Sequence, residues 1–126
     1  MVKRENVNYI CPLHVHKFIA CNIFYSRQAV QNLGPIFMLV NCAGFSIPKK
    51  FEHLTPKEER SQMEVNYFGS TNVTRAVLPD MKSHGEGGHI VFVASQAAFL
   101  GLYGLSSYCA SKFAIRGFAE SLAMGK

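Results

Sequence analysis

Hydrophobic residues gather in short continuous runs along this chain, and these runs are separated by longer mixed stretches. Residues 36–40 form the first clear run, and residues 89–94 form a second one that is rich in β-branched side chains. Runs of this length and composition are typical of parallel strands that are covered on both faces. The pattern therefore predicts two buried strands, each followed by a helix.

The helix after the first strand has a clear start signal. An N-cap hydroxyl, a proline at the first helical position and a glutamate three residues after the cap stand together as Thr55, Pro56 and Glu58. The helix should run to about Leu78, where Pro79 breaks or kinks it, and the glycines of 85–88 should form the next turn. Another helix is predicted from near Ser107 to the end of the chain.

Residues 1–32 carry weaker signals. A strand interrupted by Pro12 is expected at about residues 9–15, and a helix at about residues 23–32 that Gly34 and Pro35 end. From residue 33 onward the order is strand, helix, strand, helix, which predicts the α/β class. We treat residues 1–126 as one partial domain, in which 1–32 is the poorly matched stretch.

Composition and charge exclude several classes of protein. Of 126 residues, 48% are hydrophobic and 17% are charged, which suits a folded core. The formal charge of +5 arises in the first 50 residues, which hold six Lys or Arg and one acidic residue. These basic residues form no cluster larger than a pair. We therefore expect no nucleic-acid partner. The apolar runs fall short of the roughly 18 residues that a membrane span needs, and the polar start disfavours a signal peptide.

The cysteines do not indicate a metal site or a disulfide framework. They stand at positions 11, 21, 42 and 109, without a scaffold spacing, so free thiols are expected. Cys11, His14, His16 and Cys21 are close in sequence, but their spacing matches no standard zinc pattern. We interpret them as ordinary residues of a strand and its loop.

Polar residues follow both predicted strands. Asn41 stands at the end of the first and Ser95 at the end of the second. Parallel strands open their carboxyl ends on one edge, where ligands bind in open α/β sheets. Tyr108 and Lys112 are four apart on a predicted helix, so they share a face. The ammonium favours the phenolate, so the tyrosine could exchange a proton with a carbonyl or alcohol; an ordinary exposed helix pair is the alternative.

Taken together, these residues resemble the short-chain dehydrogenase/reductase family. Residues 41–44 (NCAG) look like its N-N-A-G signature, and residues 108–112 (YCASK) look like its Y-x-A-S-K. The resemblance implies a Rossmann-type doubly wound parallel sheet, of which this chain holds the central part. It implies a catalytic set of Asn66, Ser95, Tyr108 and Lys112. It also implies a cofactor-binding set of Asn41, Ala43, Gly44, Tyr108 and Lys112.

The same resemblance implies hydride transfer between NADPH and a ketone. Tyr108 would protonate the developing alkoxide, and Ser95 would donate a hydrogen bond to the same oxygen. Lys112 would assist the tyrosine and bind the nicotinamide ribose, while Asn66 would hold a water of a proton relay. Each residue also has a plainer interpretation: Asn66 relieves a helix kink, Ser95 caps a turn, and residues 41–44 only connect a strand to a loop.

Within the family, residues 33–44, 90–100 and 111–117 look most like the reductases of sphingolipid synthesis. This implies a long-chain sphingoid ketone as substrate, with another lipid or a small ketone as the alternative. It also implies a place at the cytosolic face of the endoplasmic reticulum, with the cytoplasm as the alternative. Relatives associate through helices that correspond to residues 55–82 and 107–124, so a homo-oligomer is expected.

One family motif is missing from the sequence. The glycine-rich turn T-G-x-x-x-G-x-G, which lets the backbone approach the cofactor's pyrophosphate, does not occur in these 126 residues. Two hypotheses follow from its absence. The chain is either a piece of a reductase whose other parts are encoded elsewhere, or a short inactive protein that offers its two helices as an interaction surface.

Overall fold

The computed structural model describes residues 28–32, 34–85 and 87–125. The strand expected at 9–15, the first half of the helix expected at 23–32 and the four residues weighed as a zinc site lie outside this range. Residues 28–32 are helical. Gly34 ends this helix as predicted, because its φ of +87° suits glycine and its N–H donates to the carbonyl of Val30 at 3.0 Å.

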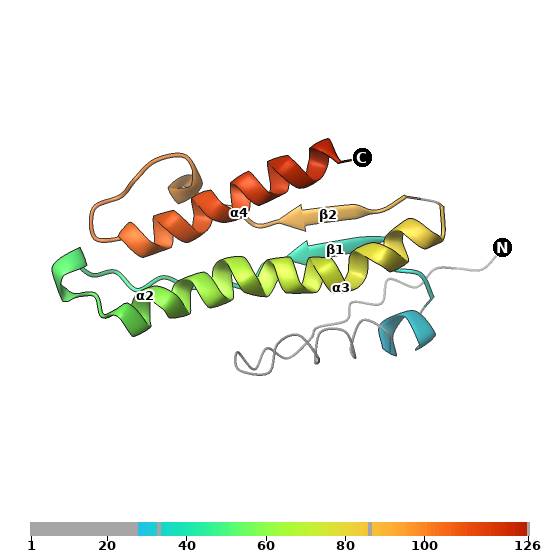
Figure 1. Ribbon diagram of the computed structural model, residues 1–126, viewed down its shortest axis with the longest axis horizontal. Helices are drawn as coiled ribbons and strands as arrows, with labels where there is room; N and C mark the ends of the chain where they lie inside the picture. Colours follow the sequence, from blue (N-terminus) through green and yellow to red (C-terminus); the bar gives the residue numbers. More distant parts are fainter. Residues whose placement is uncertain (1–27, 33, 86, 126) are drawn as a thin grey trace.

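The elements follow one another in the predicted strand-helix-strand-helix order (Figure 1). They are β1 (Met38–Asn41), α2 (Pro56–Met63), a π-helical segment (Glu64–Gly69), α3 (Ser70–Ser83), β2 (His89–Phe92) and α4 (Ser106–Met124). The strands pair in parallel, with a register that runs from Met38 opposite His89 to Asn41 opposite Phe92. Both carboxyl ends therefore open on the same edge of the sheet, as expected.

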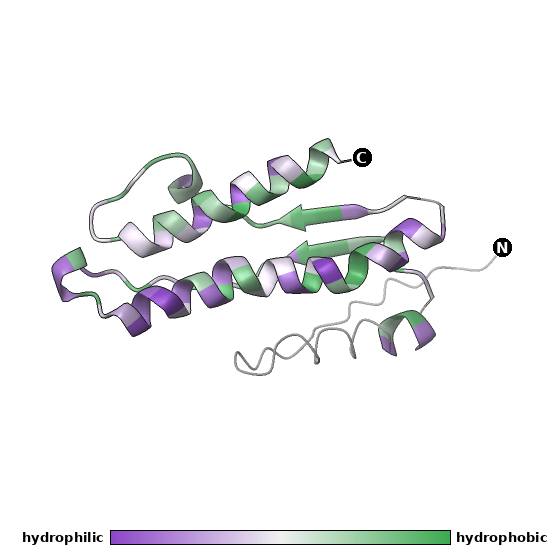
Figure 2. Ribbon diagram, in the orientation of Figure 1, coloured by the Kyte–Doolittle hydropathy of each residue, from purple (hydrophilic) through white to green (hydrophobic). Residues whose placement is uncertain are grey.

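The described helices cover only one face of this sheet. On that face Asn41 donates to the Thr74 hydroxyl of α3 at 3.2 Å, and Phe92 meets Phe118 of α4 edge to face at 5.8 Å. Alternate side chains point the other way, and there Met38 is 54% and Val40 53% exposed. The prediction that both strands are buried on both faces is thus wrong for the described residues. Figure 2 shows the two strands as largely apolar ribbons.

Helix α2 begins as its sequence predicts. The Thr55 hydroxyl accepts from the Glu58 N–H at 3.3 Å, and the Glu58 carboxylate accepts from the Thr55 N–H at 3.0 Å. This reciprocal capping satisfies N–H groups that the first turn would otherwise leave without partners.

The predicted end of this helical stretch at Leu78 is wrong, because α3 continues through Pro79 to Ser83. A proline inside a helix removes one hydrogen bond and crowds the preceding turn. Here Val77 and Met81, on either side of the proline, are only 3% and 4% exposed. Their burial favours the continued helix over a break. The turn that follows does use glycine, since Gly85 and Gly87 both have φ of +72°.

The π-helical segment between α2 and α3 contains Asn66, the residue whose plainer interpretation was the relief of a helix kink. One extra residue in its turn widens the helix, a feature that often accompanies functional sites. Tyr67 of this segment meets Phe118 of α4 edge to face at 6.2 Å. The buried apolar side chains come from α3, from the turn of residues 96–98 and from α4: they are Val77, Met81, Ala97, Ala98, Cys109 and Ile115. Among the described residues, no helix has the length and hydrophobicity needed to cross a bilayer.

Candidate active site

Lys112 lies buried beside the carboxyl end of β2. Its side chain belongs to α4, the residue is 6% exposed, and Nζ donates to the carbonyl of Val93 at 3.0 Å. The same Nζ lies 5.8 Å from the centre of the Tyr108 ring. Tyr108 and Lys112 therefore share one helix face, as predicted. Because Lys112 is buried, they are not the ordinary exposed helix pair that was the alternative interpretation.

Asn66 joins three separate parts of the chain. Its Oδ1 accepts from the N–H of Phe45 at 2.9 Å, and its Nδ2 donates to the carbonyl of Phe45 at 2.9 Å and to Ser111 Oγ at 2.9 Å. Ser111 Oγ in turn donates to the carbonyl of Tyr108 at 2.7 Å. Asn66 is only 2% exposed. It thus ties the loop after β1 to the first turns of α4, which carry Tyr108.

Gly44 lies against two of these side chains. A Cβ built on Gly44 would stand 3.1 Å from Asn66 Oδ1 and 3.6 Å from Lys112 Nζ. A real Cβ is rarely that close to another atom, so a side chain here would press on the asparagine. The bare backbone of Gly44 therefore brings the loop after β1, Asn66 and Lys112 together.

Ser95 caps a short turn, as its plainer interpretation suggested. Its Oγ accepts from the N–H of Ala97 at 3.2 Å and so closes the 3-10 turn Gln96–Ala98. This contact uses a lone pair and leaves the hydroxyl hydrogen available to another acceptor. In the described part of the chain, Ser95 and Tyr108 share no hydrogen bond.

Asn41 and Ala43 stand at the carboxyl end of β1, as predicted. The Asn41 amide is engaged with Thr74 of α3, while its carbonyl accepts from the N–H of Val93 at 2.9 Å. Ala43 is exposed. The side chain of Asn41 thus faces a helix, and its contact with a cofactor stays a prediction.

Gln62 is a residue of this region that the sequence analysis missed. It is 0% exposed, and its Oε1 accepts from the N–H of Ile47 at 3.0 Å, in the same loop that Asn66 holds. The available signal was its position four residues before Asn66, on the same helix face.

Glu58, one turn earlier, carries a perturbed carboxyl group. A hydrogen bond from the Lys49 side chain, reinforced by bonds from Thr55, lowers the pKa of Glu58 from 4.5 to about 2. The described residues contain no group of three or more His, Cys, Asp or Glu side chains that could hold a metal ion.

The chain matches known proteins along most of its length. The family model for short chain dehydrogenases matches residues 7–125. The chain is 52% identical over 98 residues to a 3-ketodihydrosphingosine reductase of Mus musculus, and 51% identical over 98 residues to a 3-dehydrosphinganine reductase of Danio rerio. Each match covers 78% of this chain and 29% of the relative.

Solved structures show the same likeness. The apo form of LigO from Sphingobium sp. strain SYK-6 aligns with a TM-score of 0.84 and 38% identity over 89% of this chain and 41% of that one. A gluconate 5-dehydrogenase from Burkholderia cenocepacia J2315, in complex with NADP and tartrate, aligns with a TM-score of 0.81 and 26% identity over 90% of this chain and 44% of that one.

The chain spans less than a third of the two curated relatives and less than half of the two solved chains. Within that span, the order of elements and the parallel pairing agree with the fold of the solved relatives. The chain belongs to the short-chain dehydrogenase family, and its sheet and helices form part of that family's Rossmann-type fold.

Proposed function

We propose that this chain is the catalytic part of an NADPH-dependent reductase that converts a ketone to an alcohol, with 3-ketodihydrosphingosine as the substrate. The observation that carries the proposal is the buried ammonium of Lys112 beside the Tyr108 ring, at the edge where β2 ends. The names of the two curated relatives support the choice of a sphingoid ketone.

The proposed chemistry uses groups that are available in this structure. Tyr108 gives its phenolic proton to the substrate oxygen, and the hydroxyl hydrogen of Ser95 stabilises the negative charge that develops there. Lys112 has three N–H donors, and one of them donates to the carbonyl of Val93. The others suit a ribose hydroxyl and the phenolate. When bound, the nicotinamide supplies the hydride.

The loop after β1 runs past the proposed ribose ligand. The backbone of Gly44 packs against Lys112 and Asn66, because a Cβ there would stand 3.6 Å from Lys112 Nζ and 3.1 Å from Asn66 Oδ1. We assign Asn41, Ala43 and Gly44 to the rim of this site, with Tyr108 and Lys112 facing them.

Asn66 has a restricted part in the proposed proton relay. Both amide hydrogens are taken, by the carbonyl of Phe45 and by Ser111 Oγ. A relay water between Lys112 and solvent would therefore be held by oxygen atoms of Asn66 and would have to donate to them.

The setting of the enzyme follows from the same resemblance. We propose the cytosolic face of the endoplasmic reticulum as its location, because sphingoid ketones are membrane lipids. We also propose a homo-oligomer that forms through residues 55–82 and 107–124.

A chimaera tests the catalytic proposal. Residues 34–124 of this chain replace the corresponding residues of the Mus musculus relative, and reduction of 3-ketodihydrosphingosine is followed by the loss of NADPH absorbance. Tyr108→Phe should remove nearly all reduction and leave NADPH affinity nearly intact, because it deletes the proton donor and little volume. Lys112→Met should damage both.

Equal losses of NADPH affinity in the two variants would contradict this division of roles. A parent chimaera that binds NADPH but does not reduce the ketone would favour the second hypothesis, an inactive family member that only binds a partner.

A further inference from the structure

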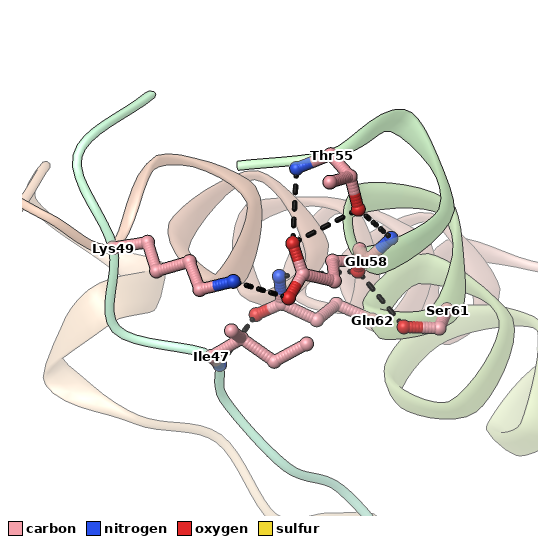
Figure 3. A network of polar contacts seen from close by, with 6 residues as sticks. All are labelled: Ile47, Lys49, Thr55, Glu58, Ser61 and Gln62. Carbon is pink, nitrogen blue, oxygen red and sulfur yellow. Dashed lines mark hydrogen bonds and ion pairs between the residues drawn. The ribbon is translucent and has the colours of Figure 1, made fainter. Parts of the chain in front are cut away.

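Three side chains on one helix face hold the loop after β1 at regular intervals. Glu58, Gln62 and Asn66 are each four residues apart, and they contact residues 49, 47 and 45 in that order. The contacts are an ion pair with Lys49, a bond from the Ile47 N–H at 3.0 Å, and the pair of bonds to the backbone of Phe45. We call this set of contacts the loop ladder. Figure 3 shows its Glu58 and Gln62 rungs.

The spacing of the loop ladder has a simple physical basis. Four residues of an α-helix rise about 6 Å, and two residues of an extended chain span about 6.6 Å. A chain running antiparallel to a helix can therefore present every second residue to every fourth helical residue. Residues 42–50 have no regular secondary structure and run alongside α2 (Figure 1). The helix thus sets the register of this loop.

Gln62 is the buried middle rung. It is 0% exposed, and its Nε2 lies 3.4 Å from the carbonyl of Glu58, a weak bond that aims Oε1 at Ile47. Ser61 also donates to the carbonyl of Glu58, at 2.8 Å, but among the described residues its side chain makes no hydrogen bond to the loop. The two neighbours therefore share a hydrogen-bond partner, and only Gln62 is also bonded to the loop.

The two ends of the loop reach the proposed catalytic groups. At one end, Gly44 lies against Asn66 and Lys112. At the other end, the N–H of Lys49 donates at 2.9 Å to the carbonyl of Gly104, in the turn that leads into α4 and Tyr108. A loop that shifts along α2 would move both ends.

We propose that Gln62 is a positioning residue, which holds the loop in register so that Gly44 meets Lys112 and the turn before Tyr108 stays in place. Its catalytic consequence rests on the proposed function, whereas its effect on the loop does not. Gln62 is not expected to touch the substrate, because it acts through the Ile47 N–H.

The test compares three variants in the chimaera described above. Gln62→Leu removes the acceptor of the Ile47 N–H at similar volume, and it should lower kcat about tenfold or more and raise the KM for NADPH, because small misplacements of catalytic groups are costly. The Ile47 amide should also exchange with deuterium much faster. Ser61→Ala is the matched control and should leave kcat, KM and the exchange of Ile47 unchanged.

Gln62→Glu adds a pH readout. It keeps an acceptor for Ile47, but as a carboxylate it cannot donate to the Glu58 carbonyl, whereas its protonated form can. Its kcat against pH should therefore rise toward the parent value on the acid side, while Gln62→Leu should show the parent's profile at a lower level. This variant reports on the loop ladder even where Gln62→Leu does not fold.

Three results would overturn the proposal: an Ile47 amide that exchanges as fast in the parent as an exposed amide, equal kinetics and exchange in Gln62→Leu and Ser61→Ala, or a Gln62→Glu pH profile identical to that of the parent. Deuterium exchange needs no catalysis. If Tyr108→Phe leaves ketone reduction intact, the proposed function fails, and the exchange of Ile47 still decides whether the ladder exists.

Discussion

Replacing Asn66 by leucine is the sharpest test of how this region is held together. The change keeps a side chain of the same branched shape and deletes three hydrogen bonds at once, two to the backbone of Phe45 and one to Ser111 Oγ. In the chimaera it should lower both the free energy of unfolding and the rate of ketone reduction.

The size of the stability loss follows from the surroundings of each partner. Phe45 is 39% exposed, so its backbone groups can turn to water, and the two bonds contribute about 1 kcal/mol each. Ser111 is 0% exposed and loses the donor to its oxygen, which costs about 1–3 kcal/mol. Burial of the leucine offsets about 1 kcal/mol. The free energy of unfolding should therefore fall by about 2–4 kcal/mol.

Urea unfolding, followed by fluorescence or circular dichroism, measures this loss. Asn72→Leu is the matched control, because it makes the same chemical change on the neighbouring helix α3. There the Asn72 side chain accepts a hydrogen bond from Arg75 at 3.1 Å in an exposed pair, and it makes no other hydrogen bond among the described residues. The control should change stability by less than about 0.5 kcal/mol. Equal losses in the two variants would refute the role of Asn66 as the link between the loop and α4.

Three further predictions use other parts of the structure. Gly44→Ala places a methyl group 3.1 Å from Asn66 Oδ1, so NADPH titration of the chimaera should show weaker binding while the unfolding midpoint changes little. The pKa of Glu58 lies at about 2 in the folded chain, so its contribution to stability is complete above the unfolded value of about 4.5 and is lost as the pH falls toward 2. Glu58→Gln should therefore flatten the acid branch of stability against pH between these values, and an unchanged branch would contradict the ion pair with Lys49. The isolated 126-residue chain should neither bind NADPH tightly nor reduce a ketone, because it has no glycine-rich pyrophosphate turn and exposes Met38 and Val40 on one sheet face; micromolar binding with turnover would contradict this.

The sequence by itself determined the features that depend on neighbouring residues. The capping box at Thr55 and Glu58, the glycines of the turn before β2, and the shared face of Tyr108 and Lys112 are all set by contacts within one helical turn or one loop. The order of the elements and the parallel pairing also followed from the apolar runs, because few arrangements bury two such strands.

Only the tertiary structure decided the features that depend on distant partners. Helix α3 continues through Pro79 because Val77 and Met81 are buried in the fold. The stabilisation from this burial is not part of the local helix preference of the sequence. Among the described residues the sheet is covered on one face only, since a run of apolar residues does not reveal how many helices are present to cover it. The role of Gln62 could not be predicted from the sequence, because a glutamine in a helix is usually exposed. Its partner, the Ile47 N–H, lies 15 residues away in the sequence. Almost every residue carries a backbone N–H, so the sequence does not indicate that the Ile47 N–H binds a particular side chain. The alignment of the loop with the helix is therefore evident only in the tertiary structure.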